Sequence, residues 1–259
     1  MRERREVITA VIAGVVGVAL LSATFLVFVQ PRIAQQVQAS APGPRWAPRP
    51  AAPPVAAGPD TVGSNAGIQT LVEPKWATEA AAATGIPKRA VLAYAGATLA
   101  KAESMPDCKL SWTTLAAIGD VESSNGQHGG SSIGANGKVT PPIFGVALDG
   151  NGVASIPDSD DGTIDNDAKA DRAVGPMQLI PQTWLNWHTD GNADGLEDPQ
   201  NIYDSVMAAT NYLCRSSTGL DTEKGWRTAI SAYNLADSYL SKVASVAMRY
   251  NADAARVTG

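Results

Sequence analysis

An uncharged apolar run at the N-terminus constrains this chain more than any other feature of its sequence. Val7 to Val29 contains no charged side chain, and as a helix this run would span about 34 Å, enough to cross the hydrocarbon core of a membrane. Three arginines precede the run within residues 1–6, and only Arg32 follows it closely. This charge bias predicts residues 1–6 as a cytoplasmic tail, residues 7–29 as a single-pass anchor, and the rest of the chain outside.

A cleavable signal peptide is the alternative for this segment. Its apolar region normally spans about 7–15 residues and is followed at once by a cleavage site of small residues. Here the nearest such site, Ala39-Ser40-Ala41, lies beyond a further polar stretch. In both cases the bulk of the chain is exported. We expect it at the outer face of a bacterial cytoplasmic membrane, or secreted after cleavage.

Residues 30–70 read as a disordered linker because Pro and Ala dominate them and no apolar period is present. Such a stretch favours extended, polyproline-like conformations and would let a domain stand as much as ~120 Å from the membrane. Trp46 is an isolated aromatic residue in this tether. The remaining residues, 71–259, have the size of one ordinary domain.

Helical patterns dominate residues 71–259. Pro87 suits the start of a helix, and Ser111 suits the N-cap of a second helix with Trp112, Leu115 and Ile118 on one side. Further helices are expected at 181–186, 201–215, 223–235 and 237–250. The stretch 125–172 has no convincing period, and irregular segments of that length are usually functional. The predicted fold class is mainly α with a long irregular insertion.

Charge and composition exclude several classes of protein. An apolar fraction of 44% is in the globular range and excludes disorder throughout. The net charge is -5 and no long Lys/Arg run occurs, which argues against a nucleic-acid partner. Two cysteines and two histidines argue against a His/Cys zinc site. His128 and His188 stand alone in the sequence and are expected at the surface.

Glu122 occupies an unusual place for a glutamate. It follows Leu115 by seven residues and Ile118 by four, so it lies on the apolar stripe of its helix, in the last turn before Asn125-Gly126. Partial burial and the negative end of a helix both raise a carboxyl pKa. A carboxylic acid still protonated near neutral pH is what general acid catalysis requires. Taken alone, a solvated last-turn glutamate remains the plainer alternative.

Three motifs in order resemble the lytic transglycosylases, specifically relatives of membrane-bound lytic transglycosylase B. They are Glu122-Ser123, Gly175-Pro176-Met177-Gln178 within the longer string 173–184, and Ala232-Tyr233-Asn234. The resemblance covers about residues 85–250. It implies a lysozyme-like catalytic domain, with Glu122 at the bottom of a glycan groove.

The resemblance also implies roles for the neighbours of Glu122. Ser123 and Tyr233 would hydrogen-bond near the catalytic carboxyl, and Gln178 and Asn234 would contact the sugar. Ser123 as a polar helix end and Tyr233 as a core residue are the alternatives. We assign Met177 to packing. Trp184 and Trp187 would stack on sugar faces or pack in the core.

The expected function is a peptidoglycan lytic transglycosylase. Glu122 would act first as acid and then as base, cleave the MurNAc–GlcNAc β-1,4 bond, and leave a 1,6-anhydro-muramic acid end. The alternatives are a lysozyme-like hydrolase in the same groove and a non-catalytic glycan-binding scaffold. Ordinary glycosidases need two carboxylates, and Asp120 points to another face of the helix than Glu122. The alternative source of a second carboxylate is the Asp cluster at 158–171, folded over the groove. No organic cofactor is expected. Cell-division or wall-synthesis partners cannot be identified from the sequence.

A calcium loop is predicted after residue 189. Asp190, Asn192 and Asp194 alternate as in an EF-hand, followed by a Gly and then the Leu196 carbonyl. The resemblance implies closure by an acidic residue at position 15, where Asp204 stands. A solvated Asp/Gly turn is the alternative. A looser acidic cluster, Asp158, Asp160 and Asp161 with Asp165 and Asp167, is a weaker candidate for a second metal site.

The two cysteines, Cys108 and Cys214, most simply form one disulfide in an exported domain. Neither cysteine has a histidine near it in sequence, which argues against reactive thiol chemistry.

Overall fold

The computed structural model describes residues 54–58 and 66–257. The predicted anchor at 7–29, most of the predicted linker and Trp46 lie outside these residues. Among the described residues, no helix has the length and apolarity needed to span a membrane. The described chain is mainly helical, with two small antiparallel strand pairs.

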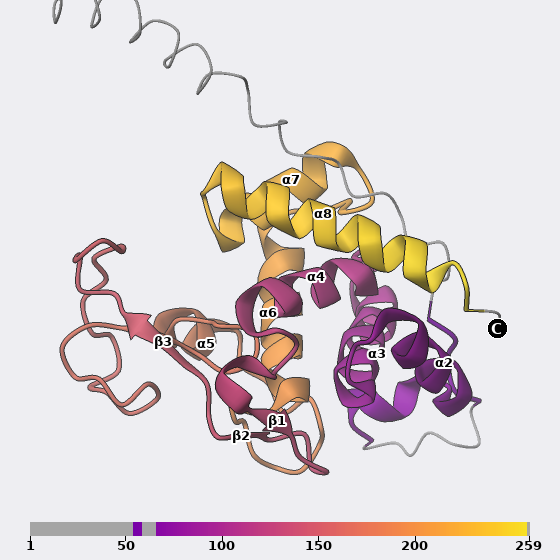
Figure 1. Cartoon of the computed structure of the whole chain (residues 1–259), viewed down its shortest axis with the longest axis horizontal. Helices are drawn as coiled ribbons and strands as arrows, with labels where there is room; N and C mark the ends of the chain where they lie inside the picture. The colour runs from indigo at the N-terminus through magenta and orange to yellow at the C-terminus, as the bar shows by residue number, and fades with distance from the viewer. Residues whose placement is uncertain (1–53, 59–65, 258–259) are drawn as a thin grey trace, which may run out of the picture. The chain divides into compact units, whose positions relative to one another are not determined.

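The helices follow one another as α2 (Pro74–Thr84), α3 (Lys88–Ser104), α4 (Trp112–Ser123), α5 (Pro181–Trp187), α6 (Ile202–Ser216), α7 (Glu223–Tyr233) and α8 (Asp237–Ala254). Figure 1 shows α8 lying across α4, with α3 and α6 beneath. Their shared core includes Trp112, Leu115, Ile118 and Trp226, all essentially buried.

Local chemistry sets several of the helix starts as the sequence predicts. The Ser111 hydroxyl accepts a hydrogen bond from the Thr113 N–H, so Ser111 is the N-cap of α4. Asn201 caps α6 in the same way, through the N–H of Tyr203. Pro181 begins α5, where its missing N–H costs no hydrogen bond. Helix α2 has no counterpart among the sequence-based predictions, and Glu73 caps its first turn.

The folded domain extends N-terminal of residue 71, where the linker is predicted to end. The 3-10 helix η2 (Ile68–Leu71) packs on α3, and Ile68 is buried. Gly96 of α3 permits this contact, because a Cβ there would lie 2.1 Å from the Ile68 carbonyl oxygen. Ala56 pairs with Val72 in an antiparallel bridge. These contacts make the end of the Pro/Ala-rich segment part of the domain.

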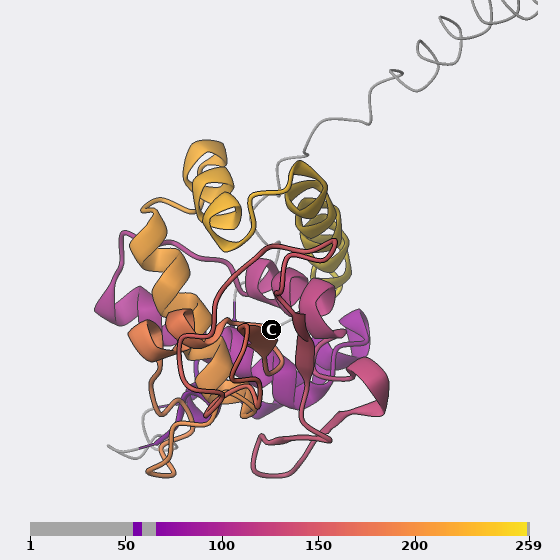
Figure 2. The same ribbon diagram turned by 90° about the vertical axis from the view of Figure 1, so that its left-hand side faces the viewer.

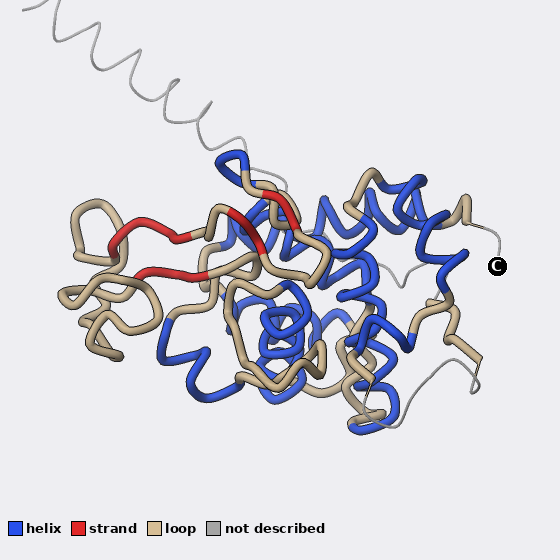
Figure 3. Tube along the Cα trace, turned by 90° about the horizontal axis from the view of Figure 1, so that it is seen from below, coloured by secondary structure: helices blue, strands red, loops and turns tan. Residues whose placement is uncertain are grey.

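The stretch 125–172 contains more regular structure than its sequence predicts. It carries the 3-10 helix η3 (His128–Gly130) and the strands β1 (Ser132–Ile133), β2 (Val139–Thr140) and β3 (Phe144–Ala147). β1 pairs with β2, and β3 pairs with β4 (Arg172–Val174), with Phe144 opposite Val174. Figure 3 shows β3 and β4, with the long loops beside them, to one side of the helices, and Figure 2 views the molecule from that side. The strands are too short to display a period in the sequence.

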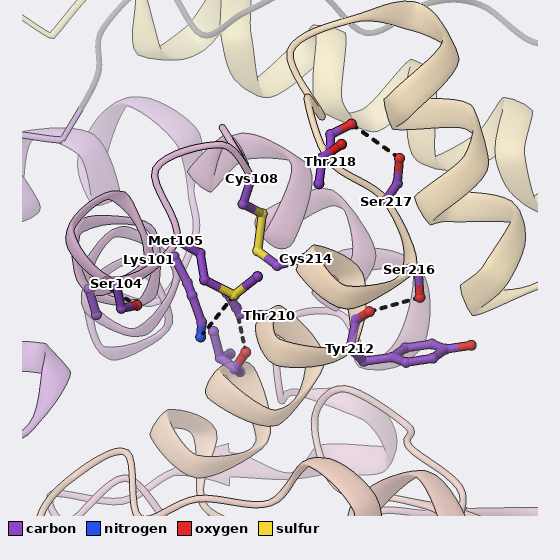
Figure 4. Close-up of a disulfide and its surroundings, with 12 residues drawn as sticks. Lys101, Ser104, Met105, Cys108, Thr210, Tyr212, Cys214, Ser216, Ser217 and Thr218 are labelled. Atoms are coloured by element: carbon purple, nitrogen blue, oxygen red, sulfur yellow. Dashed lines mark hydrogen bonds between the residues drawn. A yellow bond between two sulfur atoms is a disulfide. The ribbon is translucent and has the colours of Figure 1, made fainter.

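The predicted disulfide is present. Cys108, between α3 and α4, is bonded to Cys214 in α6, and both residues are about 1% exposed (Figure 4). The bond joins positions 106 residues apart. Closing so long a loop removes much of the conformational freedom of the unfolded chain.

Replacing both cysteines by alanine is expected to lower the free energy of unfolding by as much as about 4 kcal/mol, chiefly through the unfolded chain. Urea denaturation of the two proteins, oxidised and in the presence of a reductant, measures this loss. The reductant should destabilise the wild type and leave the double variant unchanged. Equal unfolding midpoints for the wild type and the variant would contradict the role of the bond.

Candidate active site

Glu122 lies in the last turn of α4, on the side of the helix that faces the core. Leu115 and Ile118 on the same stripe are fully buried, whereas Glu122 is only half-buried. Its carboxyl group therefore lies at the edge of the core and remains within reach of solvent. This is the position that the apolar stripe predicts for it.

A buried hydrogen-bond network fixes the end of α4 just after Glu122. The chain leaves the helix through Ser124 and Asn125, both with left-handed backbone conformations. The side-chain Oδ1 of Asn125 accepts from the hydroxyl of Tyr94 at 2.9 Å, and its Nδ2 donates to the hydroxyl of Tyr250 at 3.1 Å. Buried polar groups that are fully paired hold one geometry, so the helix end is rigid.

The three motifs are joined by two short hydrogen bonds to one turn. The Ser123 hydroxyl donates to the Pro176 carbonyl at 2.6 Å, and the Tyr233 hydroxyl donates to the Met177 carbonyl at 2.6 Å. Ser123 is buried, and its oxygen also accepts from the Gly126 N–H at 2.8 Å. None of these partners is the Glu122 carboxyl. Ser123 and Tyr233 therefore hold the Gly175–Gln178 turn against α4 and α7.

Only glycine fits at the start of this turn. Gly175 has φ 73°, and a Cβ on it would lie 1.8 Å from the Pro199 carbonyl oxygen. Gln178 also has a positive φ, 48°, and its amide donates back to the Gly175 carbonyl at 2.9 Å. Met177 is fully buried, which agrees with its assignment to packing.

Tyr239, in the first turn of α8, is the hydrogen-bond partner of Glu122. Its hydroxyl donates to Glu122 Oε1 at 2.5 Å. Burial and the nearby carboxylate both raise the pKa of Tyr239, so this phenol stays protonated and remains the donor. No pattern in the sequence points to Tyr239. Its place in the predicted 237–250 helix gave no signal, because the contact joins residues 117 positions apart.

Burial raises the pKa of Glu122 to about 7. The hydrogen bond from Tyr239 and the positive charge of Lys242 act in the opposite direction and lower it. The sequence predicts a raised pKa from burial and the helix end, and burial is the largest cause here. Glu122 is therefore divided between its acid and its base form near neutral pH.

Asp120 does not form a carboxylate pair with Glu122. Its Oδ2 accepts from Arg249 of α8 at 3.0 Å, and its Oδ1 accepts from Asn125. Within the described part of the chain, no carboxylate is among the groups that shift the pKa of Glu122. A like charge close by would have raised it further.

The other predicted sugar contacts differ in exposure. Asn234 is exposed at the end of α7, where its Oδ1 accepts from the Ala236 N–H at 3.0 Å. Trp184 is 4% exposed and belongs to the core, whereas Trp187 is partly exposed. His128 and His188 are exposed, as predicted, and His188 contacts Glu197.

The residues of the predicted calcium loop lie between α5 and α6. The Asp190 carboxylate accepts from the N–H groups of Asp194 and Gly195, at 3.2 and 2.8 Å. Asp204 closes the loop by accepting from the Gly191 N–H at 2.8 Å. Burial raises the pKa of Asp204 to about 6.

The remaining predicted ligands of this loop are near its surface. The Asn192 amide donates to Asp194 at 2.8 Å, and Leu196 is 69% exposed. All the side-chain atoms that would bind a metal ion in this loop are oxygens, the ligand type that calcium prefers. The carboxylates of Asp190, Asp194 and Asp204 are not gathered into one close group in the described structure.

A close group of three carboxylates does exist elsewhere in the described chain. One oxygen each of Asp158, Asp160 and Asp171 lies within 4.8 Å of the others, so this group is able to hold a metal ion. Asp171 is fully buried and accepts from the N–H and hydroxyl of Ser159 at 2.8 and 2.9 Å. Asp160 Oδ1 is buried without a hydrogen-bond partner. The group overlaps the acidic cluster predicted at 158–167 and adds Asp171 to it.

Comparison with known protein families identifies the domain. The model of the family described as "Transglycosylase SLT domain" matches residues 100–255, more than half of the chain. The chain belongs to the transglycosylase SLT domain family. No curated protein and no solved structure matches it. The match is to the family as a whole and does not single out the transglycosylase B subgroup.

Membership of this family makes the chain an enzyme, a lytic transglycosylase that acts on peptidoglycan. The match spans α4 to α8 and so includes Glu122, the 175–178 turn and Tyr233. A wall substrate together with the Cys108–Cys214 disulfide indicates a location outside the cytoplasm.

Replacing Tyr239 by phenylalanine is expected to raise the pKa of Glu122 above its wild-type value by about one unit. The variant loses a hydrogen bond that stabilises the carboxylate form, and such bonds contribute roughly 1.5–3 kcal/mol. A carbon-13 NMR titration of the Glu122 carboxyl measures this shift.

Tyr233→Phe is the matched control, because its hydroxyl contacts Met177 and not Glu122. The control should titrate like the wild type. Equal shifts in the two variants, or no shift in Tyr239→Phe, would contradict the assignment of Tyr239.

Proposed function

We propose that Glu122 is the single catalytic carboxyl group of a peptidoglycan lytic transglycosylase. The enzyme cleaves the MurNAc–GlcNAc β-1,4 bond and leaves a 1,6-anhydro-muramic acid end. The observation that carries this proposal is the pKa of Glu122, raised to about 7 by burial in a position that keeps the carboxyl within reach of solvent. A group with this pKa gives up and takes back a proton with little cost near neutral pH.

The reaction uses the same carboxyl group twice, first as an acid and then as a base. Protonated Glu122 gives its proton to the glycosidic oxygen, and the bond from C1 of the muramic sugar to that oxygen breaks. The C6 hydroxyl of the same sugar then bonds to C1, and its proton passes to the Glu122 carboxylate. The attack is intramolecular and has a high effective molarity, so no activated water is needed. Glu122 ends the cycle protonated, as it began.

The surrounding residues have supporting roles in this proposal. Tyr239 holds Oε1 of Glu122, while Oε2 accepts no hydrogen bond from the described residues and is left for the substrate. Ser123 and Tyr233 act as positioning residues through the turn that carries Gln178. Gln178 and exposed Asn234 are proposed to contact sugar hydroxyl or acetamido groups.

Asp120, the acid nearest to Glu122 in sequence, pairs with Arg249 and Asn125, and this favours the reaction over hydrolysis by a pair of carboxylates. A hydrolase with two carboxylates places the second one within about 10 Å of the first, to activate a water or to act as nucleophile. The proposal has two further parts. A retained anchor at 7–29 and a tether hold the domain at the membrane, and the chain is related to the transglycosylase B subgroup.

Replacing Glu122 by glutamine is expected to reduce strand cleavage by at least about a thousandfold, because an amide cannot donate or accept the required proton. Fold and glycan binding should persist, since the amide oxygen still accepts from Tyr239. Release of soluble fragments from purified glycan strands measures the rate. Asp120→Asn is the matched control, two residues away on the same helix, and should retain most of the activity.

The chemistry of the products distinguishes the transglycosylase from a hydrolase. Each cut should leave a 1,6-anhydro end that borohydride does not reduce. A hydrolase would leave reducing ends and products heavier by one water. Mass spectrometry before and after reduction separates these outcomes. Reducible muramic ends, or substantial cleavage by Glu122→Gln, would overturn the proposal.

A structural calcium ion is the second part of the proposed function. The loop from Asp190 to Asp204 is folded around its first aspartate and closed by its last, and its ligands would be Asp190, Asn192, Asp194, the Leu196 carbonyl and Asp204. The ion would supply charge that holds this loop together and would take no part in the reaction. The Asp158, Asp160 and Asp171 group is the other place where the described residues suit a divalent cation.

Calcium is expected to raise the melting temperature in proportion to the logarithm of its concentration, because it binds the folded state. Asp194→Asn should abolish this effect, and Asp160→Asn should retain it. Thermal unfolding at graded free calcium, with chelator as the baseline, measures both variants. If Asp160→Asn abolishes the effect and Asp194→Asn retains it, the ion belongs to the other acidic group.

A further inference from the structure

A pocket of about 490 Å³ lies between the end of α3, the end of α5 and the C-terminal half of α6. Its lining includes Lys101 of α3 and Trp187 of α5, with Asn211 and Arg215 of α6. Figure 4 shows Lys101 and Met105 beside the Cys108–Cys214 disulfide, which ties this end of α3 to α6. None of these residues has a role in the proposed reaction at Glu122.

Two cations line this pocket without an anionic partner. Lys101 contacts the Met105 sulfur at 3.9 Å, and no ion pair to Lys101 or Arg215 occurs among the described residues. No carboxylate is among the described lining residues. Two unpaired cations in one pocket stand out in a protein whose net charge is -5. Burial also lowers the pKa of Lys101.

The rest of the lining suits a peptide better than a bare inorganic anion. Trp187 offers an apolar ring and Met105 a thioether, both partly exposed. The Asn211 amide donates to the Trp187 carbonyl at 3.1 Å, which leaves its own oxygen as an acceptor for a ligand N–H. The cations can bind a carboxylate, the Asn211 oxygen can accept from an amide, and the apolar surface can contact a small side chain. These features match a short anionic peptide.

A row of aromatic rings connects this pocket with the catalytic carboxyl group. The ring centroid of Trp187 is 6.4 Å from that of Tyr212, which is 6.0 Å from that of Tyr233. Tyr233 stacks on Tyr239 with centroids 6.5 Å apart, and Tyr239 contacts Glu122. The pocket and Glu122 therefore lie within the span of one glycan segment and its attached peptide.

We propose that this pocket binds the free carboxylates of the short peptides that peptidoglycan carries on its muramic sugars. The enzyme therefore prefers peptide-bearing strands to naked glycan. This inference rests on the proposed function in one respect: the peptide is attached to the glycan strand that is cut at Glu122.

The test uses the whole 259-residue chain, with a double variant, Lys101→Gln and Arg215→Gln, and a control, Arg89→Gln with Lys224→Gln. Both pairs remove two positive charges, and the control positions are exposed and lie outside the pocket lining. Three substrates are compared: naked strands, strands bearing peptides with free carboxylates, and the same strands with those carboxylates amidated. The value of kcat/KM is measured for each at low and at high salt.

The wild type should cut peptide-bearing strands about tenfold more efficiently than naked or amidated strands, through a lower KM. The double variant should lose this preference and cut naked strands at the wild-type rate, while the control keeps it. High salt should shrink the preference, because a partly exposed charge pair is screened.

Equal efficiency of the wild type on all three substrates, or an equal loss on all three in the double variant, would overturn the proposal. Inhibition by inorganic phosphate without any dependence on the peptide would overturn it as well. A failure of the proposed function looks different, because naked strands would then yield no anhydro ends with the wild type either.

Discussion

Two consecutive backbone carbonyls hold the proposed active site together. Pro176 and Met177 accept hydrogen bonds of 2.6 Å from Ser123 of α4 and from Tyr233 of α7, so one turn links two helices that are distant in sequence. The turn can present both carbonyls only because Gly175 has a positive φ and no Cβ, and comes close to the Pro199 carbonyl. A side chain at this glycine would displace the turn, and its links to α4, which carries Glu122, and to α7 would both be lost.

The balance around Glu122 follows from this scaffold. Burial by itself favours the neutral acid, while the Tyr239 hydroxyl and Lys242 favour the carboxylate, and the pKa settles near 7. Tyr239 reaches Glu122 because α8 lies across α4 and Tyr233 stacks on its ring at 6.5 Å. Tyr233, which holds the turn, thus also stacks on Tyr239, whose hydroxyl lowers the pKa of Glu122. The site is built through contacts between helices rather than from a single motif.

The sequence predicted what local chemistry decides. Ser111, Pro181 and Asn201 mark helix starts correctly, because a cap or a proline acts within one turn. The apolar stripe also places Glu122 at the edge of the core. The sequence could not reveal Tyr239, because its contact with Glu122 is made between two helices. It also could not show that the Ser123 side chain is buried. The sequence predicted only part of the acidic group at 158–171. Asp171 was missed because the pairing of β3 with β4 is what brings it close to Asp158 and Asp160.

The long insertion is part of the site's support. β3 and β4 pair so that the chain leaves β4 directly into Gly175, whose N–H donates to the Ile143 carbonyl at 2.9 Å. Val174 and Leu179 exchange two hydrogen bonds, which close the turn between them. Gln200 binds both the N–H and the carbonyl of Ile143 at 2.9 Å, and so fixes the insertion to the segment before α6. A segment without a visible period in the sequence therefore sets the position of the turn that is bonded to the helix carrying Glu122.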